Sequence, residues 1–115
     1  MDTKKTVLIN TTLGDIKEID LSIDPDKNEI FKLLGGPGTF IGQWPESDVV
    51  IMKCRVSVKT LYINENKLGF PFDSENVSGP ILLIRMDQNA DHADFTLTEY
   101  LESTLFHQEQ PPRIA

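Results

Sequence analysis

The segment Asp48-Val49-Val50-Ile51-Met52-Lys53-Cys54 decides the fold class of this chain of 115 residues. Its apolar and β-branched side chains follow one another almost without interruption, which is typical of a central strand covered on both faces. A second run of this kind extends from Ile81 to Met86, and a shorter one from Thr6 to Asn10. The pattern therefore predicts a sheet built around buried strands.

Weaker signals place further strands around these. Residues 19–23 alternate apolar and polar side chains, the period of a half-buried strand, and we expect them to form a hairpin with Thr6–Asn10. A looser alternation from Thr39 to Trp44 predicts another strand. Residues 56–63 either continue the central strand after a bend or form a short strand of their own. Proline and short polar residues between Phe70 and Gly79 predict a loop.

A first helix is bounded by clear start and stop signals. Asp24 can accept hydrogen bonds from the amides of a first turn, and Pro25 suits the first helical position because its missing N–H costs nothing there. Gly35 can end the helix in a left-handed conformation. We therefore predict a helix from Pro25 to Leu34, with one apolar face formed by Ile30, Phe31, Leu33 and Leu34.

A second helix has the strongest local signature in the chain. Thr96 and Glu99 form a Thr-x-x-Glu capping box, and Phe95 and Tyr100 have the spacing of a hydrophobic staple. These signals predict a helix that begins after Thr96. Its buried stripe is expected to contain Leu97, Leu101, Leu105 and Phe106.

Strands and helices alternate irregularly along the chain, which favours an α+β fold. We expect a mostly antiparallel four- to five-stranded sheet with two helices packed on one face. The length suits one domain at residues 1–106, followed by a Pro-containing C-terminal tail at residues 107–115.

Charge and composition exclude several classes of protein. The formal net charge is −7, and between residues 73 and 112 eight acidic residues face one basic residue, Arg85. This balance argues against direct nucleic-acid binding. One cysteine allows no internal disulfide, and no apolar run approaches the length of a membrane span. We expect an intracellular protein, cytoplasmic, nuclear or virion-associated, that does not insert into a membrane.

No motif predicts a catalytic residue, a cofactor, a metal ion or a small-molecule substrate. Gly35-Gly36-Pro37-Gly38 follows a predicted helix rather than opening one, and lacks the Lys-Ser/Thr pair of a phosphate-binding loop. The acidic runs that start at Asp24 and Asp87 lack the glycine and glutamate that a calcium loop requires. One enzymatic alternative stays open, a site assembled from Cys54, His92 and carboxylates such as Asp73 or Asp94.

The remaining candidates are aromatic residues and a proline in connecting segments, namely Trp44, Phe70, Pro71 and Phe72. Such side chains either plug the core or, where exposed, anchor a protein partner. We expect one of the two phenylalanines to enter the core, since an exposed ring forgoes about 1.5–3 kcal/mol of burial. The other, with Pro71, would form a shallow apolar patch rimmed by Asp73 and Glu75.

Five segments, taken in order, resemble a family of small, functionally uncharacterised α/β proteins encoded by tailed phages, large DNA viruses of algae and some microalgae. The resemblance covers about residues 16–102, and residues 54–63 depart from it because they appear longer than the corresponding connection. It implies a compact sheet-and-helix domain and a viral or algal context, and it carries over no site residue. The segments are Ile30-Phe31-Lys32-Leu33-Leu34-Gly35-Gly36, Asp48-Val49-Val50-Ile51, Asn64-Glu65-Asn66-Lys67-Leu68, Gly79-Pro80-Ile81-Leu82-Leu83-Ile84 and Asp94-Phe95-Thr96-Leu97-Thr98-Glu99-Tyr100.

Two functions other than catalysis follow from these observations. The first is a non-enzymatic protein-interaction or accessory module, such as a minor viral component, that binds a protein partner or itself. The second is an acidic inhibitor that mimics DNA and binds a DNA-processing enzyme, which would require carboxylates at phosphate-like spacing on one face.

Overall fold

A computed structural model describes residues 3–10, 15–44, 47–55, 72, 80–89, 91–103 and 106. The predicted elements at residues 56–63, most of the loop at residues 70–79 and the tail at 107–115 lie outside these residues. No helix in the described part of the chain is long and apolar enough to cross a membrane. The described elements are β1 (Lys4–Asn10), β2 (Asp15–Leu21), the 3₁₀ helix η1 (Pro25–Lys27), α1 (Glu29–Leu34), β3 (Gly38–Gln43), β4 (Val49–Cys54), β5 (Ile81–Met86), β6 (His92–Ala93) and α2 (Leu97–Glu102).

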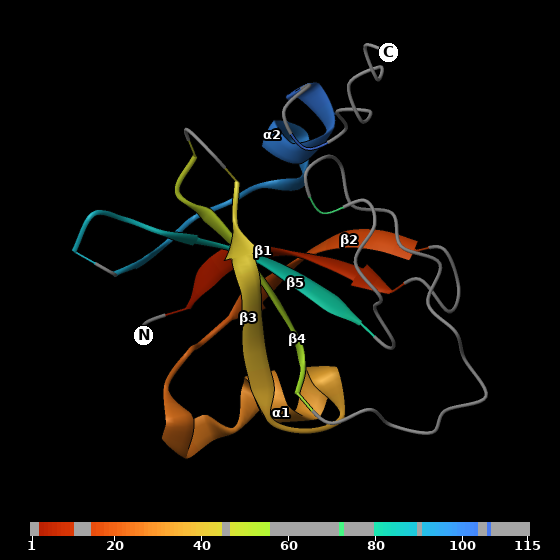
Figure 1. Cartoon of the computed structure of the whole chain (residues 1–115), viewed down its shortest axis with the longest axis vertical. Helices are drawn as coiled ribbons and strands as arrows, with labels where there is room; N and C mark the ends of the chain where they lie inside the picture. The colour runs from red at the N-terminus through yellow and green to blue at the C-terminus, as the bar shows by residue number, and fades with distance from the viewer. Residues whose placement is uncertain are drawn as a thin grey trace, which may run out of the picture.

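The strands form one sheet in the order β2-β1-β5-β4-β3, with β6 paired to β5 (Figure 1). Every pairing among them is antiparallel. The predicted antiparallel α+β sheet is therefore confirmed, and so are the buried strands at β4 and β5. The hairpin of β1 with β2 is also confirmed, although its second strand spans Asp15–Leu21 rather than residues 19–23. The described sheet has six strands because the two-residue strand β6 adds to β5, a pairing too short to give a sequence signal.

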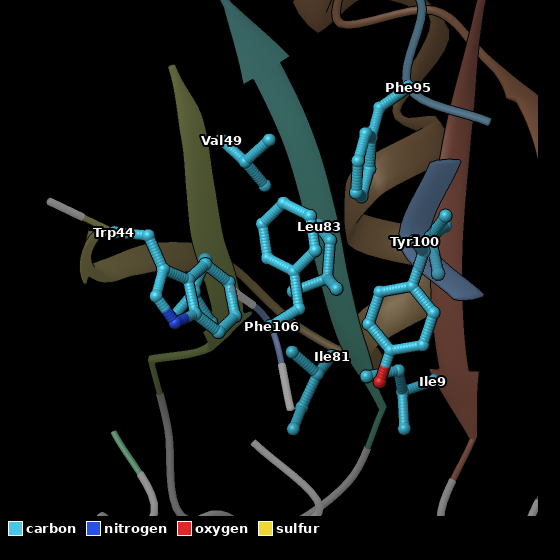
Figure 2. Packing of buried hydrophobic residues seen from close by; sticks show 10 residues of the cluster. Ile9, Trp44, Val49, Ile81, Leu83, Phe95, Tyr100 and Phe106 are labelled. Atoms are coloured by element: carbon cyan, nitrogen blue, oxygen red, sulfur yellow. The ribbon is translucent and has the colours of Figure 1, made fainter. Parts of the chain in front are cut away.

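Apolar side chains lie on both faces of the central strands. Val7 pairs with Leu83 and Leu8 with Leu82, so neighbouring positions of β1 and β5 point to opposite faces. One face carries the cluster that contains Leu83, Trp44 and Tyr100, and part of it is drawn in Figure 2. The other face carries the cluster that contains Leu82 and Leu34.

The two helices belong to different clusters, which corrects the prediction that both pack on one face. Leu34 of α1 packs with Leu82 and Met52, whereas Tyr100 of α2 packs with Leu83 and with Phe106. In Figure 1, α1 lies at the bottom of the view and α2 at the top. The physical reason lies in the sequence of β5, whose first four residues are all apolar and all buried, so that both faces of this strand need cover.

The first predicted helix is divided in two. Asp24 Oδ1 accepts a hydrogen bond from the amide of Asp26 at 2.9 Å and caps η1, as the sequence predicts. Asn28 then adopts a left-handed conformation with φ of 54°, which interrupts the helix before α1 begins. Gly35 ends α1 with φ of 78°, in the predicted left-handed cap, and its amide donates to the carbonyl of Phe31.

The second predicted helix begins where its capping box indicates. Thr96 Oγ1 accepts a hydrogen bond from the amide of Glu99 at 3.1 Å, and the rings of Phe95 and Tyr100 meet edge to face. The predicted buried stripe is only partly confirmed, because Leu101 is 60% exposed and α2 ends at Glu102. Phe106, beyond the end of α2, is buried as predicted, and Leu105 lies outside the described residues. Burial in α2 therefore rests on Tyr100, with Leu97 packed beside it.

Candidate interaction surface

The two edges of the sheet differ in charge. The edge strand β2 carries Lys17, Glu18 and Asp20, and charges of this kind discourage pairing with another chain. The opposite edge strand, β3, reads Gly-Thr-Phe-Ile-Gly-Gln and has no charged residue. Among the described residues no strand pairs with the outer side of β3. This edge therefore lacks the protection that β2 has.

An apolar groove of about 250 Å³ lies beside β3, between that strand and the segment that carries η1 and α1. We call it the α1 groove. Its floor includes Met52 of β4 and Gly38 of β3, and Ile23 and Phe31 form part of its wall. Polar groups are few, so the groove suits an apolar side chain better than a charged ligand.

Local hydrogen bonds hold the wall of the α1 groove in place. Glu29 Oε1 accepts from the amide of Ser22, and Ser22 Oγ accepts from the amide of Asp24, both at 3.3 Å. The left-handed residue Asn28 turns the chain between η1 and α1. These contacts fix the direction of α1 across the sheet, and that direction decides which side chains of the helix reach solvent.

Two phenylalanine rings near the α1 groove are more exposed than buried. Phe31 on α1 is 53% exposed and Phe40 on β3 is 54% exposed. Phe40 pairs with Met52 and therefore points to the face that carries α1. Among the described residues the remaining exposed large apolar side chains are Ile23, in the groove wall, and Leu101 on α2. The exposed aromatic side chains thus gather on one face, beside the open edge.

Sequence reasoning assigned Phe31 to the buried face of its helix, and the structure corrects this. Ile30, Leu33 and Leu34 pack against the cluster under α1, at positions i, i+3 and i+4. Phe31 lies one position beyond that stripe. The 3.6-residue period of an α-helix, applied strictly to this helix of six residues, indicates that Phe31 is exposed. For Phe40, the short alternating strand gives no pattern that distinguishes an exposed side chain from a buried one.

The aromatic residues predicted as partner anchors lie elsewhere. Trp44 is 1% exposed, and its ring contacts the ring of Phe106 at a centroid distance of 5.0 Å (Figure 2). It also contacts the ring of Phe72, at 5.3 Å. It is a core residue and cannot reach a partner. Phe72 is half-buried and packs against the same cluster. Phe70 and Pro71 lie outside the described residues, so the patch predicted around them stays a prediction.

The proposed catalytic pair of Cys54 and His92 does not form. His92 pairs with Met86 at one end of β5, whereas Cys54 lies beyond the pairing of Lys53 with Ile81, at the other end. At about 3.3 Å per residue the two side chains are roughly 15 Å or more apart. Cys54 is also buried at 5% exposure. Among the described residues no group of three His, Cys, Asp or Glu side chains could hold a metal ion.

His92 has a structural environment instead. Its Nε2 atom lies 3.2 Å from Oγ1 of the buried Thr6, and its buried Nδ1 atom has no hydrogen-bond partner among the described residues. Burial lowers the pKa of His92 from the usual 6.5, and the charge of Lys4 lowers it further, while Asp94 opposes this shift. The folded protein therefore disfavours the imidazolium form.

We expect His92 to make stability depend on pH. The imidazole of the unfolded chain binds its proton at a higher pH than the imidazole of the folded chain does. The contribution of neutral His92 to the free energy of unfolding is therefore complete above about pH 6.5, and it is lost as the pH falls through the pKa of the folded protein. Urea unfolding of the wild type and of His92→Gln between about pH 7.5 and pH 5 measures this. The difference between the two proteins should change with pH in this window. A constant difference would contradict the assignment.

A family model matches residues 7–103 and describes a family of unknown function (DUF5880). The chain belongs to this family. No curated protein and no solved structure gives a significant match. The matched range includes the α1 groove, β3 and both helices, so the surface described above lies within the part that defines the family. The resemblance to an uncharacterised family is confirmed at that level, and the viral and algal distribution stays a prediction.

Proposed function

We propose that this protein is a non-enzymatic interaction module that binds a protein partner through the α1 groove and the exposed phenylalanines beside it. The observation that carries the proposal is the position of Phe31 and Phe40, each more than half exposed on one face, next to an edge strand that has no charged residue and that no other described strand covers. Each ring, little more than half exposed, forgoes about half of the ~1.5–3 kcal/mol that full burial contributes. Exposed apolar side chains that gather on one face in this way mark interaction surfaces.

The core does not need these rings. The cluster beneath α1 is closed by Leu34, Leu82 and Ile84, each at most 2% exposed. Removal of an exposed ring should therefore leave the fold intact and weaken only the binding of a partner. An anchor at a protein interface has this combination of properties.

The acidic residues give less support to the alternative of a DNA mimic. Glu99 is bound by Arg85, Asp94 Oδ1 accepts from the amide of Lys5, and Asp87 Oδ1 accepts from two amides of its own loop. Among the described residues, carboxylates held in this way serve the fold first, so these three give no support to an array at phosphate-like spacing. The proposed viral or accessory context, and the expected intracellular location, rest on the sequence alone.

Replacing either Phe31 or Phe40 with serine should abolish stoichiometric co-purification of a protein partner from the source cells. The melting temperature should stay within about 2 °C of the wild type, because surface substitutions change stability by only about 0.5 kcal/mol. Leu101→Ser is the matched control, since Leu101 is also an exposed apolar residue but lies on α2, across the sheet. If the control loses the partner equally, or if the wild type binds neither another protein nor a second copy of itself, the proposal is wrong.

A further inference from the structure

The backbone of β3 offers hydrogen-bonding groups at an edge that no strand of the described residues covers. The amide of Arg55 donates to the carbonyl of Pro37, and Gly38 pairs with Cys54. Because hydrogen-bonded and non-hydrogen-bonded pairs alternate in an antiparallel ladder, Gly38 and Phe40 fall in non-hydrogen-bonded pairs. Their N–H and C=O groups therefore point away from β4 and toward the edge.

The bulge in β3 decides how much of this edge is regular. The register with β4 shifts between Phe40 and Gly42, so the regular part of the strand runs from Gly38 to Phe40. A second strand can pair with this part without a bulge of its own. Thr39 is its central residue.

This short edge is complementary to itself. If two copies pair antiparallel about a two-fold axis at Thr39, Phe40 of one copy lies opposite Gly38 of the other, and the outward groups of both residues form hydrogen bonds. Cross-strand partners share a face, so the exposed Phe40 ring lies over a residue that has no side chain. Gly38 lines the α1 groove, which places the ring at the groove of the second copy.

We propose that the partner at this edge is a second copy of the chain, joined through antiparallel β3–β3 pairing about a two-fold axis at Thr39, with Phe40 of each copy in the α1 groove of the other. The inference rests on the proposed function and names its partner. It also explains why β3 has no charged residue, since an edge strand that stays unpaired usually carries charged residues that prevent pairing.

Disulfide formation between copies tests the register. The axis brings the two Cα atoms at position 39 to about 4.5 Å, within the range that a disulfide bridges, and leaves those at position 43 roughly 25 Å apart. Mild oxidation of Thr39→Cys should give a covalent dimer, whereas Gln43→Cys should stay monomeric although position 43 is more exposed. Equal cross-linking of the two variants, or none at position 39, would overturn the proposal.

Sedimentation equilibrium of the full chain tests the affinity. The wild type should form a dimer, and Phe40→Ser should weaken dimerisation by about tenfold or more, as removal of a central aromatic anchor does. Leu101→Ser should leave it unchanged. A wild type that stays monomeric at millimolar concentration refutes self-pairing. If the wild type is monomeric but binds a different protein, and Phe40→Ser abolishes that binding, the interaction module is supported and only its partner differs. If the monomeric wild type binds no protein at all, both proposals fail.

Discussion

Replacing Trp44 with alanine should lower the free energy of unfolding by about 3–5 kcal/mol, the cost of deleting a large aromatic side chain from a packed core. The ring is almost fully buried and contacts Phe72 and Phe106 edge to face. Its loss removes both aromatic contacts and leaves a cavity over Ile51 and Val49 in the same cluster. Urea unfolding followed by circular dichroism measures the effect, because the chain has only one tryptophan and its fluorescence is lost with the substitution.

Phe40→Ala is the matched control. Phe40 is also aromatic and also lies next to β4, but its side chain is more than half exposed. We expect it to cost less than about 1 kcal/mol. Trp44→Phe keeps a ring in the cavity and should fall between the two. If Trp44→Ala destabilises the protein no more than Phe40→Ala does, Trp44 is not the core residue described here.

The contrast between these two aromatic residues shows what could be read from the sequence. Trp44 stands before a proline at the end of a strand, a position that is equally common for a core plug and for an exposed anchor. Which of the two it is depends on Phe72 and Phe106, residues far away in the sequence that complete the cluster around it. No local pattern contains this information.

Local chemistry predicted the element boundaries well where caps decide them. Asp24, Gly35 and Thr96 each perform the role that their side chain or backbone favours, whereas the side chain of Glu99 binds Arg85. The buried strands were also predictable, because a run such as Ile81–Ile84 has no polar face to expose. The division of the helices between the two faces was not, since it depends on the path of the chain between strands that are distant in sequence.

The candidate surface was missed for a related reason. Phe31 and Phe40 lie in elements of six residues each, where a few apolar side chains fit more than one face. Their exposure follows from the direction of α1 over the sheet and from the position of β3 at its edge. The absence of charge in residues 38–43 was the one signal in the sequence that could have marked this edge.

Among the charged residues, Arg85 should have the largest effect on the free energy of unfolding. It is the one basic residue between residues 73 and 112, a stretch that contains eight acidic residues. Its Nε donates to Asp48 Oδ1 at 2.8 Å, and its two terminal nitrogens bind the two carboxylate oxygens of Glu99. It also donates to the carbonyl of Asp94 at 3.0 Å and lies 5.3 Å from the centre of the Phe95 ring. The bond to Glu99 raises the pKa of Arg85 despite its partial burial. One guanidinium therefore joins β5, the start of β4 and α2.

Arg85→Met should destabilise the fold by about 2–3 kcal/mol, because charge-assisted hydrogen bonds are lost and Glu99 is left without its partner in a half-buried position. Arg85→Lys keeps the charge but cannot bind both oxygens of Glu99 in a fork, so it should recover only part of the loss. Hydrogen exchange should accelerate first at the amides of Leu97–Glu102, since α2 buries little apart from Tyr100 and depends on this contact for its position.

The exposed ion pair of Lys5 with Asp20 is the control, because both side chains are well solvated and a pair of this kind contributes little. Lys5→Met should leave the unfolding midpoint unchanged, while Arg85→Met lowers it. The decisive comparison is between lysine and methionine at position 85. If Arg85→Lys and Arg85→Met lower the free energy of unfolding equally, the stabilisation comes from the forked hydrogen bonds of arginine and not from its charge. If lysine matches the wild type, the charge alone suffices, and the proposed joining of α2 to the sheet through paired hydrogen bonds is wrong.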